Sequence, residues 1–269
     1  MSAGGPGGEA HGGTAPGKLI AFGVLGGLIG IYAAHFLSSI SPAFSFMGAL
    51  GAICAIVWGA DAVRRVCSYG LGTGVPSIGM IALGMGVVAS LFGLAVGGIA
   101  GPIVAVIAAA IIGLVIGVLA NKVLGMNIPI MEKTMVEIGV AGALAIVGLS
   151  TAMAGTFMFD EVLALVVAPG YIAVIFIAGG MGILHPFNAC LGPDEEQDRT
   201  LAVAYEKGAI AMIIAGIVSM VVSATAAIPT IMIGVFIWYI SFTKFYELTK
   251  RDAYKVLGTG LLPTEEELQ

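Results

Sequence analysis

The acidic side chains are the residues of this sequence best suited to chemistry, and they lie at the ends of long apolar stretches or between them. Asp61 is followed by Arg64 and Arg65, so its carboxylate can form local ion pairs at helical spacing or serve an ion path. Asp160 and Glu161 are adjacent carboxylates in a short turn, where they could collect or release cations or simply be solvated. These three acidic residues are candidates for handling an ion.

The longest polar insertion, HPFNACLGPDEEQDRT at 185–200, contains the remaining candidates. It brings His185, Asn188, Asp194 and Glu195 into one loop. Such a set could bind a metal ion, but its spacing matches no standard metal-ligand pattern. Loops display side chains to partners, and acidic runs attract basic surfaces, so a docking surface is the better interpretation.

The sequence contains none of the common catalytic signatures. There is no P-loop, nucleophile elbow or dinucleotide fingerprint. Cys54, Cys67 and Cys190 fit neither a CxxC nor a zinc pattern. A net charge of -5 provides no basic footprint for nucleic acid. We therefore predict no catalytic residue, metal ligand or cofactor site in this chain, and no nucleic-acid partner.

The elements that position these residues are apolar and long. The chain is 59% hydrophobic and only 10% charged, whereas soluble domains carry about 25% charged residues. A membrane-spanning helix needs about 20 apolar residues. The pattern predicts an all-α integral membrane protein of about eight transmembrane helices, arranged as four helical hairpins, at 18–40, 42–60, 78–97, 99–120, 137–158, 162–183, 208–226 and 228–247. Asp61 should end the second helix, and residues 97–102 and Asp160–Glu161 should turn the chain back.

The basic residues predict the orientation of these helices. All eleven lie before the first predicted helix, in every second connection, or at and beyond the end of the last. The positive-inside rule then places both termini in the cytoplasm of a multi-pass cell-membrane protein. We divide the chain into a disordered cytoplasmic tail (1–17), a polytopic membrane domain (18–247) and a cytoplasmic C-terminal tail (248–269).

Glycine is abundant, with 41 residues, and several pairs lie four positions apart, as Gly113 and Gly117 do. This spacing lets helices approach closely, either within the bundle or against another subunit. No carboxylate falls at a predicted bilayer midplane, where ion carriers often place one. Neutral oxygens such as those of Ser150, Thr151 and Thr156 remain possible sodium ligands.

Two long stretches carry a family resemblance. Residues 51–79, from GAICAIVWGADAVRR to SYGLGTGVPSIG, and the loop 185–200 resemble the C subunit of tetrahydromethanopterin S-methyltransferase from methanogenic archaea. LGGLIGIYA at 25–33 and LLPTEEE at 261–267 agree with it, so the resemblance covers essentially the whole chain.

The resemblance implies membership of a complex that transfers a methyl group from methyl-tetrahydromethanopterin to coenzyme M through a corrinoid and couples the transfer to sodium export. It implies that the corrinoid and the active site belong to partner subunits, and that this chain joins sister membrane subunits in the sodium-translocating part, surrounded by membrane lipids. It supplies no catalytic residue for this chain. A passive scaffold of the same complex and an independent secondary transporter remain the alternatives.

Overall fold

The computed structural model describes residues 13–69, 74–189 and 196–255, and every regular element in these ranges is helical. The α-helices are α1 (Pro16–Ser38), α2 (Phe46–Cys67), α3 (Gly74–Gly97), α4 (Gly101–Val118), α5 (Met131–Ala154), α6 (Phe159–Val162), α7 (Tyr171–Ala189), α8 (Gln197–Ser219) and α9 (Ala224–Lys255). The shorter helices are η1 (Pro42–Ser45) and η2 (Gly98–Ala100), both 3-10, and the π-helices η3 (Leu119–Val123) and η4 (Leu163–Val167).

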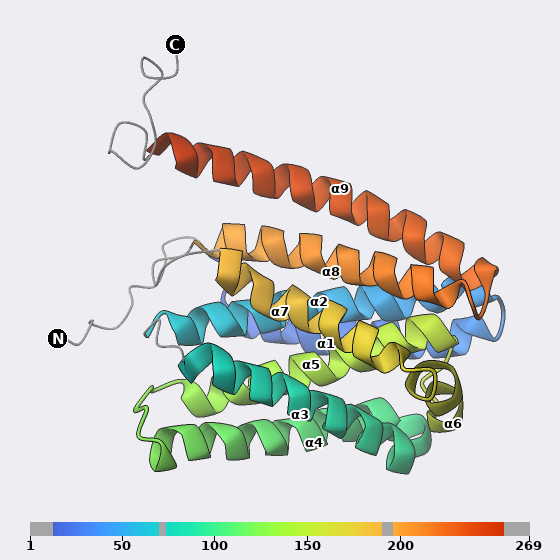
Figure 1. Cartoon of the computed structure of the whole chain (residues 1–269), viewed down its shortest axis with the longest axis horizontal. Coiled ribbons are helices and arrows are strands. Elements are labelled where there is room, and N and C mark those ends of the chain that lie inside the picture. Colours follow the sequence, from blue (N-terminus) through green and yellow to red (C-terminus); the bar gives the residue numbers. More distant parts are fainter. Residues whose placement is uncertain (1–12, 70–73, 190–195, 256–269) are drawn as a thin grey trace.

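Six described helical segments are long and apolar enough to cross a membrane, or seven if one bent pair forms a span. One of the six, Ser77–Val123, contains 47 residues, which as a single helix would extend about 70 Å, more than twice a bilayer core. The chain turns back at η2 instead, and α3 and α4 lie side by side (Figure 1). Counting α3 and α4 separately gives seven crossings among the described residues, or eight if the bent pair is one span. The all-α membrane fold is therefore confirmed.

Helix α5 forms the centre of the bundle. It packs against α1, α2, α3, α4, α7 and α8, and 94% of its most apolar window is buried inside the chain, against 28% for α9. Apolar side chains on α3, α4 and α9 remain exposed, as a lipid-facing surface requires. The bundle therefore has a protein-enclosed central helix and outer helices that face the membrane.

Glycine makes the closest helix contacts possible. A Cβ at Gly48 of α2 would lie 2.6 Å from the carbonyl oxygen of Gly148 on α5, and a Cβ at Gly148 would lie 2.6 Å from that of Gly48. Gly113 and Gly117 of α4 abut the backbone of α5 in the same way. Close backbone approach of this kind replaces the hydrophobic effect as the packing force between membrane helices. These glycines therefore serve packing within the chain.

The third predicted hairpin differs from its expected form. Helix α5 ends at Ala154, where Gly155 takes a left-handed conformation (φ 73°), so the chain turns before Asp160–Glu161 and not at that pair. The predicted single helix at 162–183 is also wrong, because Phe159–Val167 and Tyr171–Pro186 meet at 90°. Gly170 (φ 87°) lies in this bend. The other three predicted hairpins form close pairs, α1 with α2, α3 with α4, and α8 with α9.

Three helices extend beyond their predicted spans at one end of the bundle, the end at which the described chain both starts and finishes (Figure 1). Helix α1 begins at Pro16, and α9 continues to Lys255. Helix α2 continues to Cys67, so Asp61 lies within it and does not end it. The division into two tails and a membrane domain stays a prediction.

Candidate functional site

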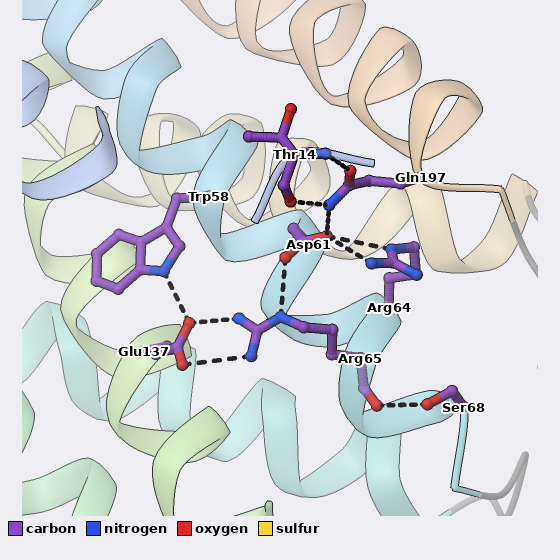
Figure 2. Close-up of polar contacts among 8 residues, drawn as sticks. All are labelled: Thr14, Trp58, Asp61, Arg64, Arg65, Ser68, Glu137 and Gln197. Carbon is purple, nitrogen blue, oxygen red and sulfur yellow. Dashed lines mark hydrogen bonds and ion pairs between the residues drawn. The ribbon is translucent and has the colours of Figure 1, made fainter. Parts of the chain in front are cut away.

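A buried network of charged side chains surrounds Asp61 near the C-terminal end of α2 (Figure 2). The Asp61 carboxylate is fully buried. Its Oδ1 accepts hydrogen bonds from Arg64 Nε (3.1 Å) and Nη2 (2.9 Å), and its Oδ2 accepts one from Arg65 Nε (2.8 Å). The predicted local ion pair is thus present, and it lies inside the protein.

Arg65 extends this network from α2 to α5. Its two terminal nitrogens donate to the two carboxylate oxygens of Glu137, with Nη1 at 3.4 Å from Oε1. Trp58 also donates its indole N–H to Glu137 Oε2 at 2.8 Å. Glu137 is 4% exposed and Trp58 2%. The guanidinium therefore bridges two carboxylates, using the fork geometry that distinguishes Arg from Lys.

Gln197, the first residue of α8, connects the network to the N-terminal segment. Its side-chain Nε2 donates to Asp61 Oδ1 (3.0 Å) and to the Thr14 carbonyl oxygen (3.0 Å). Its Oε1 accepts the Thr14 backbone N–H at 2.6 Å. One amide side chain thus fixes the residues before α1, the start of α8 and the buried Asp61.

The sequence produces this site by simple helix geometry. Trp58, Asp61 and Arg65 are spaced i, i+3 and i+7, so they share one face of α2. Glu137 lies on the second turn of the central helix, opposite that face. Two carboxylates and two guanidinium groups have no net charge, and buried ions must be paired in this way. As arranged, the network can couple helices, and its carboxylates already have cationic partners.

Asp160 and Glu161 lie elsewhere, on the first turn of α6, and both are exposed. Nearby, His35 on α1 shares a hydrogen bond with Thr156 (Nδ1 to Oγ1, 2.9 Å) and packs against Phe157. The described part of the chain contains no group of three or more His, Cys, Asp or Glu side chains able to hold a metal ion. The structure does not bring Asp160 or Glu161 to Asp61.

The candidates from the polar insertion are only partly described. His185 is half-buried near the end of α7, and Asn188 lies in the last turn of that helix, its side chain outside the described residues. Asp194 and Glu195 also lie outside the described residues. Within the neighbouring helix α8, buried Glu206 pairs with Lys207 at 3.0 Å. The docking interpretation of this loop stays a prediction.

The three neutral oxygens on α5 and its C-terminal connection have different surroundings. Thr151 Oγ1 donates to the Val147 carbonyl oxygen at 2.7 Å, as an isolated helical Thr usually does. The Thr156 hydroxyl already shares a hydrogen bond with His35 Nδ1. Ser150 Oγ is buried and has no hydrogen-bond partner. A role of these oxygens as sodium ligands stays a prediction.

Sequence reasoning missed four members of the network: Thr14, Trp58, Glu137 and Gln197. The i, i+3 spacing of Trp58 and Asp61 could have indicated that Trp58 belongs to the network, because it places the indole N–H on the same face of α2 as the Asp61 carboxylate. No comparable signal connects Asp61 to Gln197, which lies 136 residues away.

The fold and site together define a multi-pass, all-helical membrane protein whose helices are joined at one end by a buried charged network. Residues 1–266 match the sequence profile of the family described as the C subunit of tetrahydromethanopterin S-methyltransferase. The chain belongs to this family, as its resemblance implied.

Relatives with sequence identities from 42% to 66% match nearly the whole chain. The C subunit of Methanosarcina barkeri is 66% identical over all of both chains. That of Methanothermobacter thermautotrophicus is 44% identical over 99% of each chain. That of Methanopyrus kandleri is 42% identical over 99% of this chain and 97% of its own. All three are named as the C subunit of tetrahydromethanopterin S-methyltransferase.

Proposed function

We propose that this chain is a non-catalytic membrane subunit of the methyltransferase complex, and that it contributes to the part that exports sodium during methyl transfer from methyl-tetrahydromethanopterin to coenzyme M. The observation that carries the proposal is the full-length match to relatives named as the C subunit of this methyltransferase, found in a chain built of membrane-spanning helices. The corrinoid and the reacting groups belong to partner subunits, and sodium is the transported species.

The distribution of charge supports a cytoplasmic position for both termini. The basic residues occupy the start of α1, the end of α2, η3, the first turn of α5, the first half of α8 and the second half of α9. These segments lie toward the same end of the bundle (Figure 1). Positive charge of this kind stays on the cytoplasmic side during insertion, where a soluble corrinoid-binding partner can reach it.

The buried network supports a coupling role. It joins two segments that we expect to dock a cytoplasmic partner, 61–77 and 185–200, through the hydrogen bond between Asp61 and Gln197. It also reaches the central helix through Glu137. A partner that changes shape with the methylation state of its corrinoid would press on these segments and shift α2, α5 and α8 together, switching access between the two faces.

A passive scaffold is the second candidate, and close packing in the bundle favours it. The gap lined by residues including Leu83, Gly142 and Phe176 has no room for water, and the buried charges described here are paired. We therefore propose that sodium passes along the interfaces between this chain and the sister membrane subunits. An independent transporter would need its own midplane polar site. The buried Glu206, midway along α8, already has a cationic partner in Lys207.

Gentle detergent purification of the tagged chain from its host, with mass spectrometry of the associated proteins, tests complex membership. We expect a corrinoid-binding subunit and further membrane subunits to co-purify. A stable protein that runs alone, without corrinoid, would contradict the proposal and favour the independent transporter.

A further inference from the structure

The three described residues before α1, Gly13, Thr14 and Ala15, lie against the first residue of α8 and form what we call the N-terminal strap. All three are exposed, and the first buried side chain after them is Leu19. Ala15 provides no side-chain cap for the helix that follows. Within the described residues, two hydrogen bonds hold the strap to the bundle, and Gln197 makes both. The strap is therefore attached through a single side chain.

The contact between the strap and Gln197 requires glycine at position 13. A Cβ on Gly13 would lie 2.5 Å from Gln197 Oε1 and 3.3 Å from its Cδ. The first distance is far shorter than van der Waals contact, so the carboxamide would have to move away. At Gly17, by contrast, a Cβ would meet nothing within 4 Å. Only the first of these two glycines is needed to keep the strap in place.

The strap also fixes the orientation of the Gln197 carboxamide. A carboxamide has one end that accepts hydrogen bonds and one that donates them. The Thr14 N–H donates to Oε1 at 2.6 Å, and the Thr14 carbonyl oxygen accepts from Nε2 at 3.0 Å. In that orientation Nε2 also donates to Asp61 Oδ1 at 3.0 Å. Because Gln197 lies between Thr14 and Asp61 (Figure 2), the strap supports the contact between α8 and α2.

The attachment of the strap is weak compared with the charged network beneath it. Each of the two hydrogen bonds favours the closed position about five-fold, so the strap should be lifted roughly one time in 25. The fully buried Asp61 is instead bonded to the guanidinium groups of Arg64 and Arg65, and buried pairs of this kind separate far less readily. The strap is therefore the part of this site that opens first.

We propose that the N-terminal strap is a latch on the charged network. In its closed position it keeps water from Gln197 and Asp61, which are 6% and 0% exposed, and holds α8 to α2. When it is lifted, the carboxamide turns freely, water reaches Asp61, and the contact between the two helices loosens. A partner that binds the lifted strap would release this contact, because a ligand favours the state that it binds. The proposal rests on these contacts and does not depend on sodium transport.

The test is carboxylate labelling of the whole purified complex with a water-soluble carbodiimide and glycine amide, located by peptide mass spectrometry. In the native complex Asp61 should label far more slowly than the exposed Glu247. In Gly13→Ala the rate at Asp61 should rise about ten-fold, because the strap loses its two hydrogen bonds. Gly17→Ala is the matched control and should label like the native complex. Glu137 should stay protected in all three proteins, which shows that the network is still folded.

Gly13→Val adds more bulk and decides the question if a small movement of Gln197 accommodates the alanine. A selective rise at Asp61 in either Gly13 variant supports the latch. A native labelling rate at Asp61 in both variants would overturn it, because the strap would then not cover the network. An equal rise in Gly17→Ala would overturn it as well. So would a rise at Glu137 as large as that at Asp61, since the helices would then separate without a latch.

Discussion

At the residue scale, the central feature is the pairing of buried charges around Asp61. The sequence predicted its contacts with Arg64 and Arg65, because i+3 and i+4 neighbours on a helix must meet. It did not predict the contact of Arg65 with Glu137 or that of Asp61 with Gln197, since no local rule joins residues 72 or 136 positions apart. The charged network is therefore a property of the packed bundle, although half of it is encoded locally.

Replacing Asp61 by Asn should destabilise the protein strongly. The substitution keeps the shape of the side chain but leaves two guanidinium groups with one buried carboxylate, and such a loss costs about 3–5 kcal/mol. The exposed Asp160→Asn is the matched control and should change stability by less than about 0.5 kcal/mol. Denaturant unfolding in detergent measures both. Equal stability of the two variants would show that the pairing around Asp61 contributes little.

Replacing Gln197 by Ala should release the segment before α1. The amide of Gln197 holds Thr14 through two hydrogen bonds, and their loss opens this backbone to solvent. Hydrogen exchange of the Thr14 amide should become faster, while exchange within α5 stays unchanged. Gln197→Glu should have a larger effect at neutral pH, because it places a carboxylate beside Asp61. An unchanged Thr14 exchange rate in both variants would argue that this contact is unimportant.

At the element scale, apolar segment length predicted the helices well. It did not reveal the bend between Phe159–Val167 and Tyr171–Pro186, because a straight and a bent helix can have the same hydropathy. The 90° bend depends on backbone conformation near Gly170, and the end of α5 depends on Gly155. Neither glycine stands out among the 41 in the chain. Hydropathy therefore located the spans, but the path of the sixth span required the structure.

Helix contact through glycine leads to a paired prediction. In Gly48→Ala the new methyl group would lie 2.6 Å from the Gly148 carbonyl oxygen, so α2 and α5 must separate. Such overpacking costs about 1–3 kcal/mol. In Gly84→Ala the methyl group meets nothing within 4 Å, and the better helix propensity of Ala should add up to about 1 kcal/mol. Unfolding in detergent compares the two, and a tolerated Gly48→Ala would refute close contact of α2 with α5.

At the scale of the whole molecule, charge and topology predict an orientation. Lys122 in η3 and Ala100 in η2 lie beyond opposite ends of α4 and are both exposed. In sealed right-side-out vesicles a membrane-impermeant maleimide should label Ala100→Cys and spare Lys122→Cys. The pattern should reverse in inverted vesicles. Labelling of Lys122→Cys from outside would invert the proposed topology and place both termini outside the cell.

The most direct test of the account is sodium transport by the whole complex in proteoliposomes, measured as sodium ions moved per methyl group transferred. The account predicts that Glu137→Gln, in a complex that still assembles and transfers methyl groups, lowers this ratio, because α5 loses its charged contact with Arg65. Gly84→Ala should leave the ratio unchanged. A native ratio in the assembled Glu137→Gln complex would contradict coupling through this network and favour the scaffold.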